Sequence, residues 1–373
     1  MNKFLYTLIL SLIINYNSYS QKEIFVNNII GKDTIGANYG STPNFPFKTI
    51  NFAIGRAEYG DLIIVEGLHN KESIIYKENI ILTEDKPFLR FKGVNNPIIL
   101  GSETRSNNNT GILVLNSDIQ ISGFTFMNFI GGNIEYLKMK GGAGIVLKPK
   151  NRDAIIQNCT FVNCNYGIIA IENQSLRIDG NYFKDIKKLS NNNLDGGIGI
   201  YLWSNGGYLQ DNQIGSSFAN KFEKIDNYGI LIGGEGELKL ADFTKIENNS
   251  FLNCEGTGLG IFNVEGILNI TNNTFENNNV SLEIRGVSID AVISNNKFNG
   301  TKGNYEIITD ENYPGDMLYS IWKFNDNKFK NQLYSISEPE DVQSIKSING
   351  QRALVNDLKT IQKYVTDGVN ILK

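Results

Sequence analysis

The chain of 373 residues has a single histidine and only three cysteines. One histidine removes most His-based catalytic triads and His-rich metal sites from consideration. Three cysteines cannot form a disulfide scaffold in a chain of this length. A surplus of positive charge is also lacking, since 35 Lys and Arg stand against 39 Asp and Glu and the net charge is −4. This balance argues against a nucleic-acid partner, which would require a basic face.

Long apolar runs are scarce as well. The run Phe4–Ile14 follows Lys3 and is too short to span a hydrocarbon core about 30 Å thick. The Ser-Tyr-Ser sequence at 18–20 places small residues at positions −3 and −1 of a cleavage site before Gln21, as in a secretory signal peptide. We therefore predict a signal peptide at 1–20 and a secreted mature protein (extracellular, periplasmic or at the cell surface) without a membrane span. A buried N-terminal strand or helix is the alternative.

A six-residue phrase that ends in an aromatic or aliphatic residue, here called the anchor, occurs eight times. The phrases are ISGFTF at 121–126, IQNCTF at 156–161, IDGNYF at 178–183, LQDNQI at 209–214, IENNSF at 246–251, ITNNTF at 270–275, ISNNKF at 293–298 and FNDNKF at 324–329. Three residues before each anchor only Gly, Asn or Asp occurs, the types that tolerate positive φ. The next position is asparagine in six phrases: Asn181, Asn212, Asn249, Asn273, Asn296 and Asn327. Each phrase therefore predicts a strand, a tight bend with a stacked asparagine, and a second strand.

A second phrase, Gly-Ile-x-aliphatic, follows most anchors. It occurs at 144–147, 167–170, 197–200, 229–232 and 258–261, with a variant at 281–284. Its alternation predicts a strand with one buried face, so each repeat would carry about three short strands. A unit of this size cannot bury its own apolar side and must stack on its neighbours, with parallel strands about 4.8 Å apart.

Both ends of such a solenoid need a cover. Within Pro46–Ala57 the apolar residues Ile50, Ala53, Ile54 and Ala57 share one helical face. A similar stripe (Leu354, Leu358, Ile361 and Val365) predicts a helix within 353–366. We expect residues 21–337 to form the solenoid, including a cap helix near 46–57, and residues 338–373 to form a C-terminal helical cap. A dimer-forming helix is the alternative for the C-terminal segment.

These phrases resemble the right-handed parallel β-helix repeats of the pectate-lyase-like superfamily. The segment Pro46–Gly67 is similar to the start of many secreted members, in which a short helix leads into a GD-x-I-x-V-x-x-G strand. The resemblance covers roughly residues 24–337 and implies an all-β solenoid with short helical caps. It does not imply one reaction, because this fold carries lyases, hydrolases, epimerases, adhesins and tail-spike proteins.

Cys164 and Cys254 each follow an anchor by three residues, and two further anchors lie between them. Their windings would therefore be three turns or about 14 Å apart, too far for a disulfide. Cys159 occupies an asparagine position of the repeat. We expect all three to be small buried hydrophobic residues, and a Cys159–Cys164 bridge is the alternative.

In the Gly-Ile-x-aliphatic strands, the second and fourth residues after the glycine should point outward. The fourth position gives an outward row of Lys148, Ile171, Tyr201, Gly233, Phe262 and Arg285, with Trp203 two residues further along its strand. Such a row predicts a track for an anionic sugar chain, because aromatic rings stack on sugars and basic groups pair with carboxylates or sulfates. Tyr201, Trp203 and Phe262 are the predicted substrate-binding residues. The alternative is that long loops cover these positions as a secondary packing surface.

Three insertions (127–142, 184–196 and 215–227) lie between an anchor and the next Gly-Ile strand, so they should emerge at one corner of the stack. Loops gathered on one edge of a rigid scaffold often carry binding sites. They bring Asp195 and Asp226 to the margin of the track. The later insertion 309–320, with three acidic residues, makes Ca²⁺ a possible cofactor, although no compact acidic loop pattern occurs there.

A lyase acting on a uronate polymer needs a base, a cation that stabilises the enolate, and an acid. The segment Ser281–Gly286 resembles the Arg-Gly strand of chondroitinase-B-like and alginate lyases, which implies a catalytic Arg285 with Glu283 beside it. That family places a catalytic Lys one winding earlier, where this chain has Asn263 and Val264. Lys148 is a further catalytic candidate.

Inverting hydrolysis instead needs two carboxylates about 6.5–9.5 Å apart. Asp195 and Asp226, which precede Gly197 and Gly229, are the candidate pair. The sequence thus predicts a polysaccharide lyase or hydrolase acting on a uronate-type extracellular glycan. A non-catalytic glycan-binding, adhesion or structural protein is the alternative.

Overall fold

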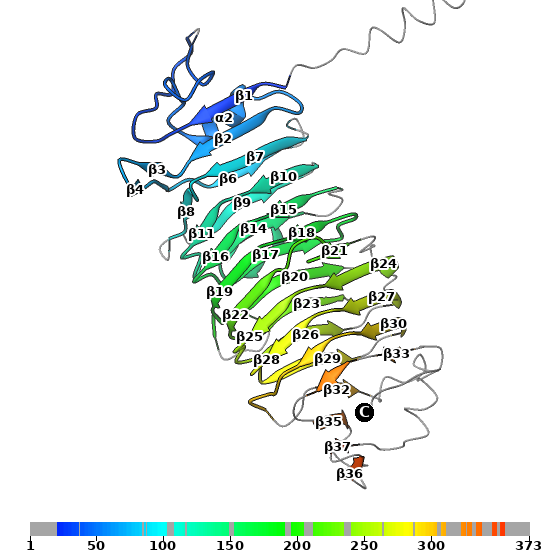
Figure 1. Cartoon of the computed structure of the whole chain (residues 1–373). Helices are drawn as coiled ribbons and strands as arrows, with labels where there is room; N and C mark the ends of the chain where they lie inside the picture. Colours follow the sequence, from blue (N-terminus) through cyan, green and yellow to red (C-terminus); the bar gives the residue numbers. More distant parts are fainter. Residues whose placement is uncertain are drawn as a thin grey trace, which may run out of the picture.

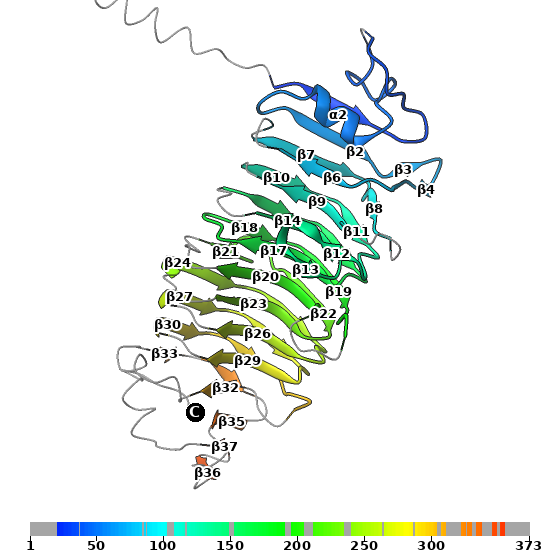
Figure 2. The same ribbon diagram turned by 180° about the vertical axis from the view of Figure 1, so that it is seen from behind.

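The computed structural model describes residues 21–36, 38–83, 86, 88–102, 108–115, 118–148, 153–190, 195–204, 212–234, 240–262, 265–285, 288–303, 307–310, 322–325, 327–329, 333–337, 345–348 and 351–354. The predicted signal peptide at 1–20 lies outside them. The chain winds as a parallel β-helix in which most windings place one strand in each of three sheets (Figure 1 and, from behind, Figure 2). The predicted all-β solenoid is therefore confirmed.

The three sheets are named here in the order in which a winding visits them. Sheet I contains β1 (Glu23–Val26), β2 (Leu62–Glu66), β7 (Leu89–Val94), β10 (Ile119–Ser122), β15 (Ile155–Gln157), β18 (Arg177–Asp179), β21 (Gln213–Ile214), β24 (Leu240–Glu247), β27 (Glu265–Thr271), β30 (Ser288–Ser294) and β33 (Trp322–Asn325). Sheet II contains β5 (Ile75–Tyr76), β8 (Ile98–Leu100), β11 (Thr125–Met127), β16 (Thr160–Val162), β19 (Tyr182–Ile186), β22 (Lys221–Ile225), β25 (Ser250–Leu252), β28 (Thr274–Glu276), β31 (Lys297–Phe298) and β34 (Lys328–Phe329). Sheet III contains β6 (Ile80–Leu82), β9 (Thr110–Val114), β14 (Ala143–Leu147), β17 (Tyr166–Ile171), β20 (Ile198–Ser204), β23 (Tyr228–Gly234), β26 (Thr257–Phe262), β29 (Val280–Arg285), β32 (Ile307–Asp310), β35 (Leu333–Ser337), β37 (Gln351–Leu354) and β36 (Ile345–Ile348).

The N-terminal end of the stack carries the helix α2 (Ile50–Arg56), which buries Ile50, Ala53 and Ile54 as the sequence pattern predicts. The helix begins at Ile50 rather than near Pro46, because the Thr49 side chain caps it by accepting a hydrogen bond from the Phe52 amide. The antiparallel hairpin β3 (Leu68–His69) and β4 (Glu72–Ser73) lies at the same end (Figure 1).

The C-terminal prediction is not confirmed. Within 338–373 the described residues are the strands β36 and β37, which pair antiparallel. Ala353 and Leu354, where the predicted helix begins, belong to β37, and the rest of that helix lies outside the described residues.

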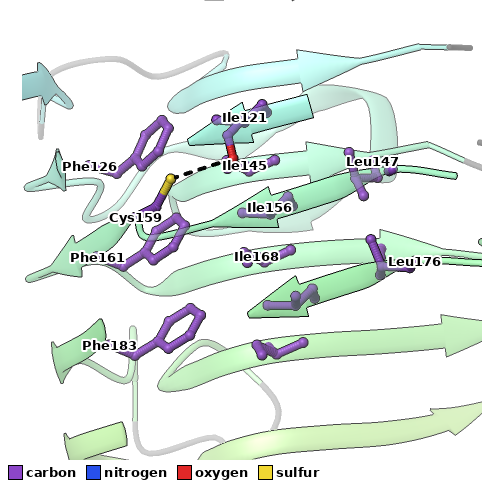
Figure 3. Packing of buried hydrophobic residues seen from close by; sticks show 14 of the residues in the cluster. Ile121, Phe126, Ile145, Leu147, Ile156, Cys159, Phe161, Ile168, Leu176 and Phe183 are labelled. Atoms are coloured by element: carbon purple, nitrogen blue, oxygen red, sulfur yellow. Dashed lines mark hydrogen bonds between the residues drawn. The ribbon is translucent and has the colours of Figure 1, made fainter. Parts of the chain in front are cut away.

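A stack of phenylalanine rings runs through the interior along sheet II. Consecutive ring centroids are 4.7–5.1 Å apart from Phe126 through Phe161, Phe183, Phe222, Phe251 and Phe275 to Phe298. Figure 3 shows the first three of these rings beside the isoleucine columns of the other two sheets. A spacing close to the distance between strands lets every winding bury its ring against the next.

Six of these seven rings, all except Phe298, lie over a glycine of sheet III. A Cβ added to Gly167 would meet the ring of Phe183 at 2.6 Å, and one added to Gly229 would meet the ring of Phe251 at 2.7 Å. The glycine of the Gly-Ile phrase therefore leaves room for the anchor of the following winding.

One of the eight predicted phrases, at 209–214, is wrong. Ile214 pairs with Ile178 and Ile246 in sheet I, so it is not an anchor. The anchor of this winding is Phe222, which pairs with Phe183 and Phe251 in sheet II. Additional residues between Ile214 and Phe222 separate the two halves of the phrase, so this phrase does not occur as six consecutive residues in the sequence.

The predicted stack of asparagines, called the asparagine ladder from here on, is confirmed with the same correction. Asn220 rather than Asn212 is its member in this winding. It runs through Asn181, Asn220, Asn249, Asn273, Asn296 and Asn327, all buried. Each Nδ2 donates to the Oδ1 of the next asparagine at 3.0–3.1 Å. Asn212 instead accepts a hydrogen bond from the Leu176 amide.

The predicted left-handed bends are confirmed where they are described: φ is positive at Gly123, Asn158, Gly180, Asn248, Asn272 and Asn295. A second left-handed column, two residues after the anchors, was missed. It contains Asn128, Asn163, Asp185, Lys224, Asn253, Asn277 and Gly300. The recurrence of Asn after the anchors would have indicated it, because asparagine tolerates this conformation well.

Cys159, Cys164 and Cys254 are free and buried, as expected for small core residues, so the alternative Cys159–Cys164 bridge is not formed. Figure 3 shows Cys159 inside the stack, with its Sγ 4.0 Å from the Ile121 carbonyl oxygen. Burial raises the pKa of each thiol to about 12.

Candidate functional site

The outer face of sheet III holds the predicted track, but in a corrected register. Gly199, not Gly197, occupies the glycine position, since Ile168 pairs with Ile200. The outward row of the fourth positions therefore carries Trp203 beside Ile171 and Gly233. Tyr201 belongs to the neighbouring row, between Ile169 and Leu231. Three glycines in the segment 196–199 made the two registers indistinguishable in the sequence.

The N-terminal part of this face is covered, in line with the alternative of a packing surface. A hairpin of β12 (Asn133–Ile134) and β13 (Met139–Lys140), joined by the short helix η1 (Glu135–Leu137), comes from the insertion 127–142. Its residues Ile134, Leu137 and Met139 pack in one hydrophobic cluster with outward residues of sheet III. The outward residues Val146 and Ile169 are consequently 0% exposed.

Beyond this cover the face becomes aromatic. Tyr201, Trp203, Tyr228 and Phe262 are half-buried and are called the aromatic track here. The rings of Tyr201 and Trp203 are parallel with centroids 5.3 Å apart, and those of Tyr228 and Phe262 meet edge to face at 5.7 Å. Three windings thus contribute to one surface. Of the three substrate-binding residues predicted from the sequence, Trp203 and Phe262 share a row.

Two glycines make room for these rings. A Cβ at Gly233 would lie 2.5 Å from an indole carbon of Trp203, and one at Gly260 would lie 2.7 Å from the Tyr228 ring and 2.9 Å from the Phe262 ring. Tyr228 was missed by the sequence interpretation. The signal was available, since Tyr228 directly precedes Gly229 as Tyr166 precedes Gly167.

Glu283 lies at the edge of the aromatic track and is only 7% exposed. Its Oε2 accepts hydrogen bonds from Thr257 Oγ1 at 3.0 Å and from Tyr228 Oη at 3.4 Å. Its backbone pairs with Gly260, which brings the carboxylate beside the residues that surround that glycine. The sequence analysis placed Glu283 beside Arg285 as a catalytic candidate, and in the structure the Glu283 carboxylate is buried and held by two hydroxyl groups.

The two basic candidates differ in position. Arg285 is the last residue of β29 and its backbone pairs with Phe262, so it lies on the row that carries Trp203. Lys148 follows β14, and its Nζ lies 5.2 Å from the centroid of the Tyr136 ring, which belongs to the covering hairpin. Cation–π contact of this kind holds the hairpin in place, and the strand register puts Lys148 two windings before Trp203.

Asp195 and Asp226 do not occupy equivalent places. Because Tyr228 pairs with Ile198, Asp226 corresponds to Gly196, one residue after Asp195. Asp226 contacts Lys187 Nζ at 3.4 Å and accepts from the Lys188 amide at 3.1 Å. These contacts give Asp226 a structural role at this corner.

Asp195 influences a neighbouring tyrosine. Burial, together with the charge of Asp195, raises the pKa of Tyr166 to about 12. Tyr166 also accepts a hydrogen bond from the Gly196 amide at 2.9 Å.

A second polar cluster, on the outer face of sheet II, was not predicted. Glu223 falls within the predicted insertion 215–227, but it belongs to β22. Its Oε2 contacts Lys221 Nζ at 2.8 Å and accepts from Tyr182 Oη at 2.6 Å. The hydrogen bonds from Lys221 and then Tyr182 lower the pKa of Glu223 to about 2. This arrangement keeps the carboxylate charged and occupied, on a different face from the aromatic track.

Metal binding receives no support from the part of the chain that is described. Among those residues no three His, Cys, Asp or Glu side chains are placed to hold a metal ion. The insertion proposed for Ca²⁺, residues 309–320, is described only at positions 309 and 310. A membrane-spanning helix is likewise not found among the described residues.

The match to a family model supports the fold. The sequence model of the family described as "Right handed beta helix region" matches residues 67–237 and 111–298. Among curated proteins none matches the chain. Solved structures with a similar backbone include the GH136 lacto-N-biosidase from Eubacterium ramulus, at 9% identity and a TM-score of 0.40, covering 83% of this chain and 68% of that one. The alginate lyase from Paenibacillus sp. str. FPU-7 is also similar, at 14% identity and a TM-score of 0.40, covering 76% of this chain and 93% of that one. Likeness at this level concerns only the winding of the chain.

Proposed function

Since the chain belongs to the right-handed β-helix family, we propose that it is an exported protein that binds an extended polysaccharide along the aromatic track of sheet III. The observation that carries this proposal is the gathering of Tyr201, Trp203, Tyr228 and Phe262 on three windings, next to the buried carboxylate of Glu283. Aromatic rings offer apolar faces for the C–H faces of sugar rings, and tyrosine and tryptophan add a polar group. A carboxylate accepts hydrogen bonds from sugar hydroxyls.

We further propose that the polymer is of the uronate type and that β-elimination takes place at the C-terminal end of the track. Arg285 shares a row with Phe262 and would supply the cation that pairs with the uronate carboxylate. Glu283 would take the C5 proton while the Tyr228 hydroxyl gives its proton to the leaving O4 oxygen, so that the C4–O bond breaks as the C4=C5 double bond forms. The hydrolase pair is disfavoured, because Asp195 and Asp226 are out of register and Asp226 already pairs with Lys187.

A non-catalytic glycan-binding or adhesion protein is the second candidate. One observation favours it: Lys148 and Asp226, two of the five catalytic candidates, are engaged in contacts within the structure. Binding by the aromatic track alone requires neither residue.

The test uses the chain from residue 21 onward with a panel of alginate, polygalacturonate, chondroitin sulfate and neutral xylan. Retention of protein on a polymer measures binding, and ultraviolet absorbance of unsaturated sugars, together with chain length, measures cleavage. Trp203→Ala should lower affinity about tenfold or more, because buried aromatic anchors dominate binding. Phe218→Ala is the matched control, since Phe218 is 61% exposed and its backbone oxygen accepts a hydrogen bond from the Gly180 amide, at the bend that follows β18 of sheet I.

Two outcomes decide the proposal. If none of the polymers retains the protein, or if Trp203→Ala binds as the Phe218→Ala control does, the proposed track is wrong. If binding occurs but Arg285→Ala leaves cleavage unchanged, the lyase assignment is wrong and the binding proposal stands.

A further inference from the structure

The hairpin that covers the N-terminal part of sheet III is anchored firmly at its base. This segment, residues 130–141, is called the strap. Gly131 and Gly142 both donate their amide protons to Asn165 Oδ1, at 2.7 and 3.1 Å. Asn109 Nδ2 donates to the carbonyl oxygens of Ile130 and Gly131 at 3.0 and 3.1 Å. Because Asn109 and Asn165 are both 0% exposed, these bonds are shielded from water and fix where the strap leaves the stack.

The strap crosses the full width of the sheet. Its base joins the chain just before Ala143, the first residue of β14, whereas its tip residue Tyr136 contacts Lys148, which follows Leu147 at the other end of the strand. Five residues of β-strand span about 17 Å. The contact between Lys148 and Tyr136 therefore directs the tip of the strap towards the edge of sheet III opposite the base.

The strap also leaves no space between itself and the sheet. The outward residues Leu113, Val146 and Ile169, one on each of three successive strands, are 1%, 0% and 0% exposed. They form one hydrophobic cluster with Ile134 and the neighbouring residues of the strap. A sugar chain cannot pass beneath the strap without breaking this packing.

The aromatic track begins on the very next winding. Tyr201 pairs with Ile169, and Trp203 pairs with Ile171, which is still 5% exposed. The surface therefore changes from a covered apolar layer to half-exposed rings within one strand spacing, about 4.8 Å. The strap stands at that boundary as a wall across the line of the track.

We propose that the strap closes the track at its N-terminal end, so that the protein takes the terminus of a polysaccharide chain rather than a segment of its interior. This inference rests on the proposed function, because it assumes that the aromatic track holds the sugar chain. An interior segment would have to continue through the position of the strap, whereas a chain end stops in front of it.

The number of binding sites per mass of polymer tests this inference. Size fractions of alginate, polygalacturonate and chondroitin sulfate are titrated at equal mass, and bound protein is measured at saturation by sedimentation. For recognition of ends, chains ten times longer should bind about ten times fewer protein molecules per milligram. A capacity per milligram that does not change with chain length would overturn the inference while leaving the proposed function intact. Failure of every fraction to bind would refute the proposed function and the inference with it.

Variants of the strap sharpen the test. Deleting residues 133–140 joins Gly132 to Gly141, whose backbones are already hydrogen-bonded at 2.9 Å. This deletion should raise the capacity of the longest fraction severalfold. Since it also uncovers apolar residues, Tyr136→Ala is the milder variant, and it should raise the same capacity to a smaller extent. Tyr59→Ala removes another exposed tyrosine, at the N-terminal end, and should change nothing. A folded deletion variant with the capacity of the wild type would contradict the role of the strap.

Discussion

Removing one asparagine from the middle of the ladder should destabilise the whole solenoid. Asn273 is 0% exposed, and its side-chain amide takes part in four hydrogen bonds. In Asn273→Ala the backbone amide of Asn249 and the carbonyl oxygen of Ile246 each lose the Asn273 side chain as a partner. The Asn249 Nδ2 and Asn296 Oδ1 atoms keep other partners. The unpaired Asn249 backbone amide costs about 1–3 kcal/mol, and the lost hydrogen bond to the Ile246 carbonyl, which stays in the sheet I ladder, costs about 0.5–1.5 kcal/mol, so we expect a loss of about 2–4 kcal/mol in the free energy of unfolding.

The adjacent residue provides the control. Asn272 is exposed and has φ +58°, so Asn272→Gly removes the same kind of side chain and keeps the left-handed bend. Its free energy of unfolding should stay within about 0.5 kcal/mol of the wild type. Urea unfolding is followed by far-ultraviolet circular dichroism and by fluorescence, because agreement of two probes tests whether the array unfolds in one step. If Asn273→Ala unfolds at the same urea concentration as Asn272→Gly, the ladder does not stabilise the fold as argued.

Three further outcomes are expected. Gly233→Ala should displace the Trp203 ring and shift its fluorescence, in a variant lacking the other tryptophan, whereas Gly55→Ala should not, since a Cβ there meets nothing within 4 Å. The pKa of Glu223 is lowered from 4.5 to about 2, first by the hydrogen bond from Lys221. Its contribution to stability is therefore complete above pH 4.5 and is lost as the pH falls towards 2. Glu223→Gln should reduce the acid sensitivity of unfolding between these pH values. The three thiols should resist a thiol reagent at neutral pH in the folded protein and all react in urea, because they are buried and their pKa values are about 12; reaction of any of them without urea would show that the interior opens.

Much of the architecture was predictable because its determinants are local. A left-handed bend needs Gly, Asn or Asp, and a buried ladder needs an amide that both donates and accepts, so these residue types recur at a constant spacing. The prediction failed where spacing changed: Phe222 and Asn220 carry the same side-chain types as their neighbours in the stack, but extra residues separate them from Ile214. A linear search compares positions along the chain, whereas the windings are matched by pairing across the sheet.

The candidate site was predictable only in part for a related reason. Trp203 and Phe262 were identified because outward positions alternate along a strand. Their neighbours on the face, however, depend on register: a shift of two residues moves Tyr201 to another row and aligns Asp226 with Gly196. Burial of Glu283 and engagement of Lys148 by the strap depend on contacts between segments far apart in sequence.

The sequence by itself determined that the chain winds, where it bends and which side chains stack, since each of these follows from residue types repeated within a few positions. Only the tertiary structure decided which windings align and why the Gly-Ile strands contain glycine at all. Gly167 has no special conformation to explain it; the Phe183 ring of the next winding occupies the space that its side chain would fill. The same holds for the strap, whose position over sheet III depends on the contact between Tyr136 and Lys148. Contacts of this kind form between windings, and no single repeat contains them.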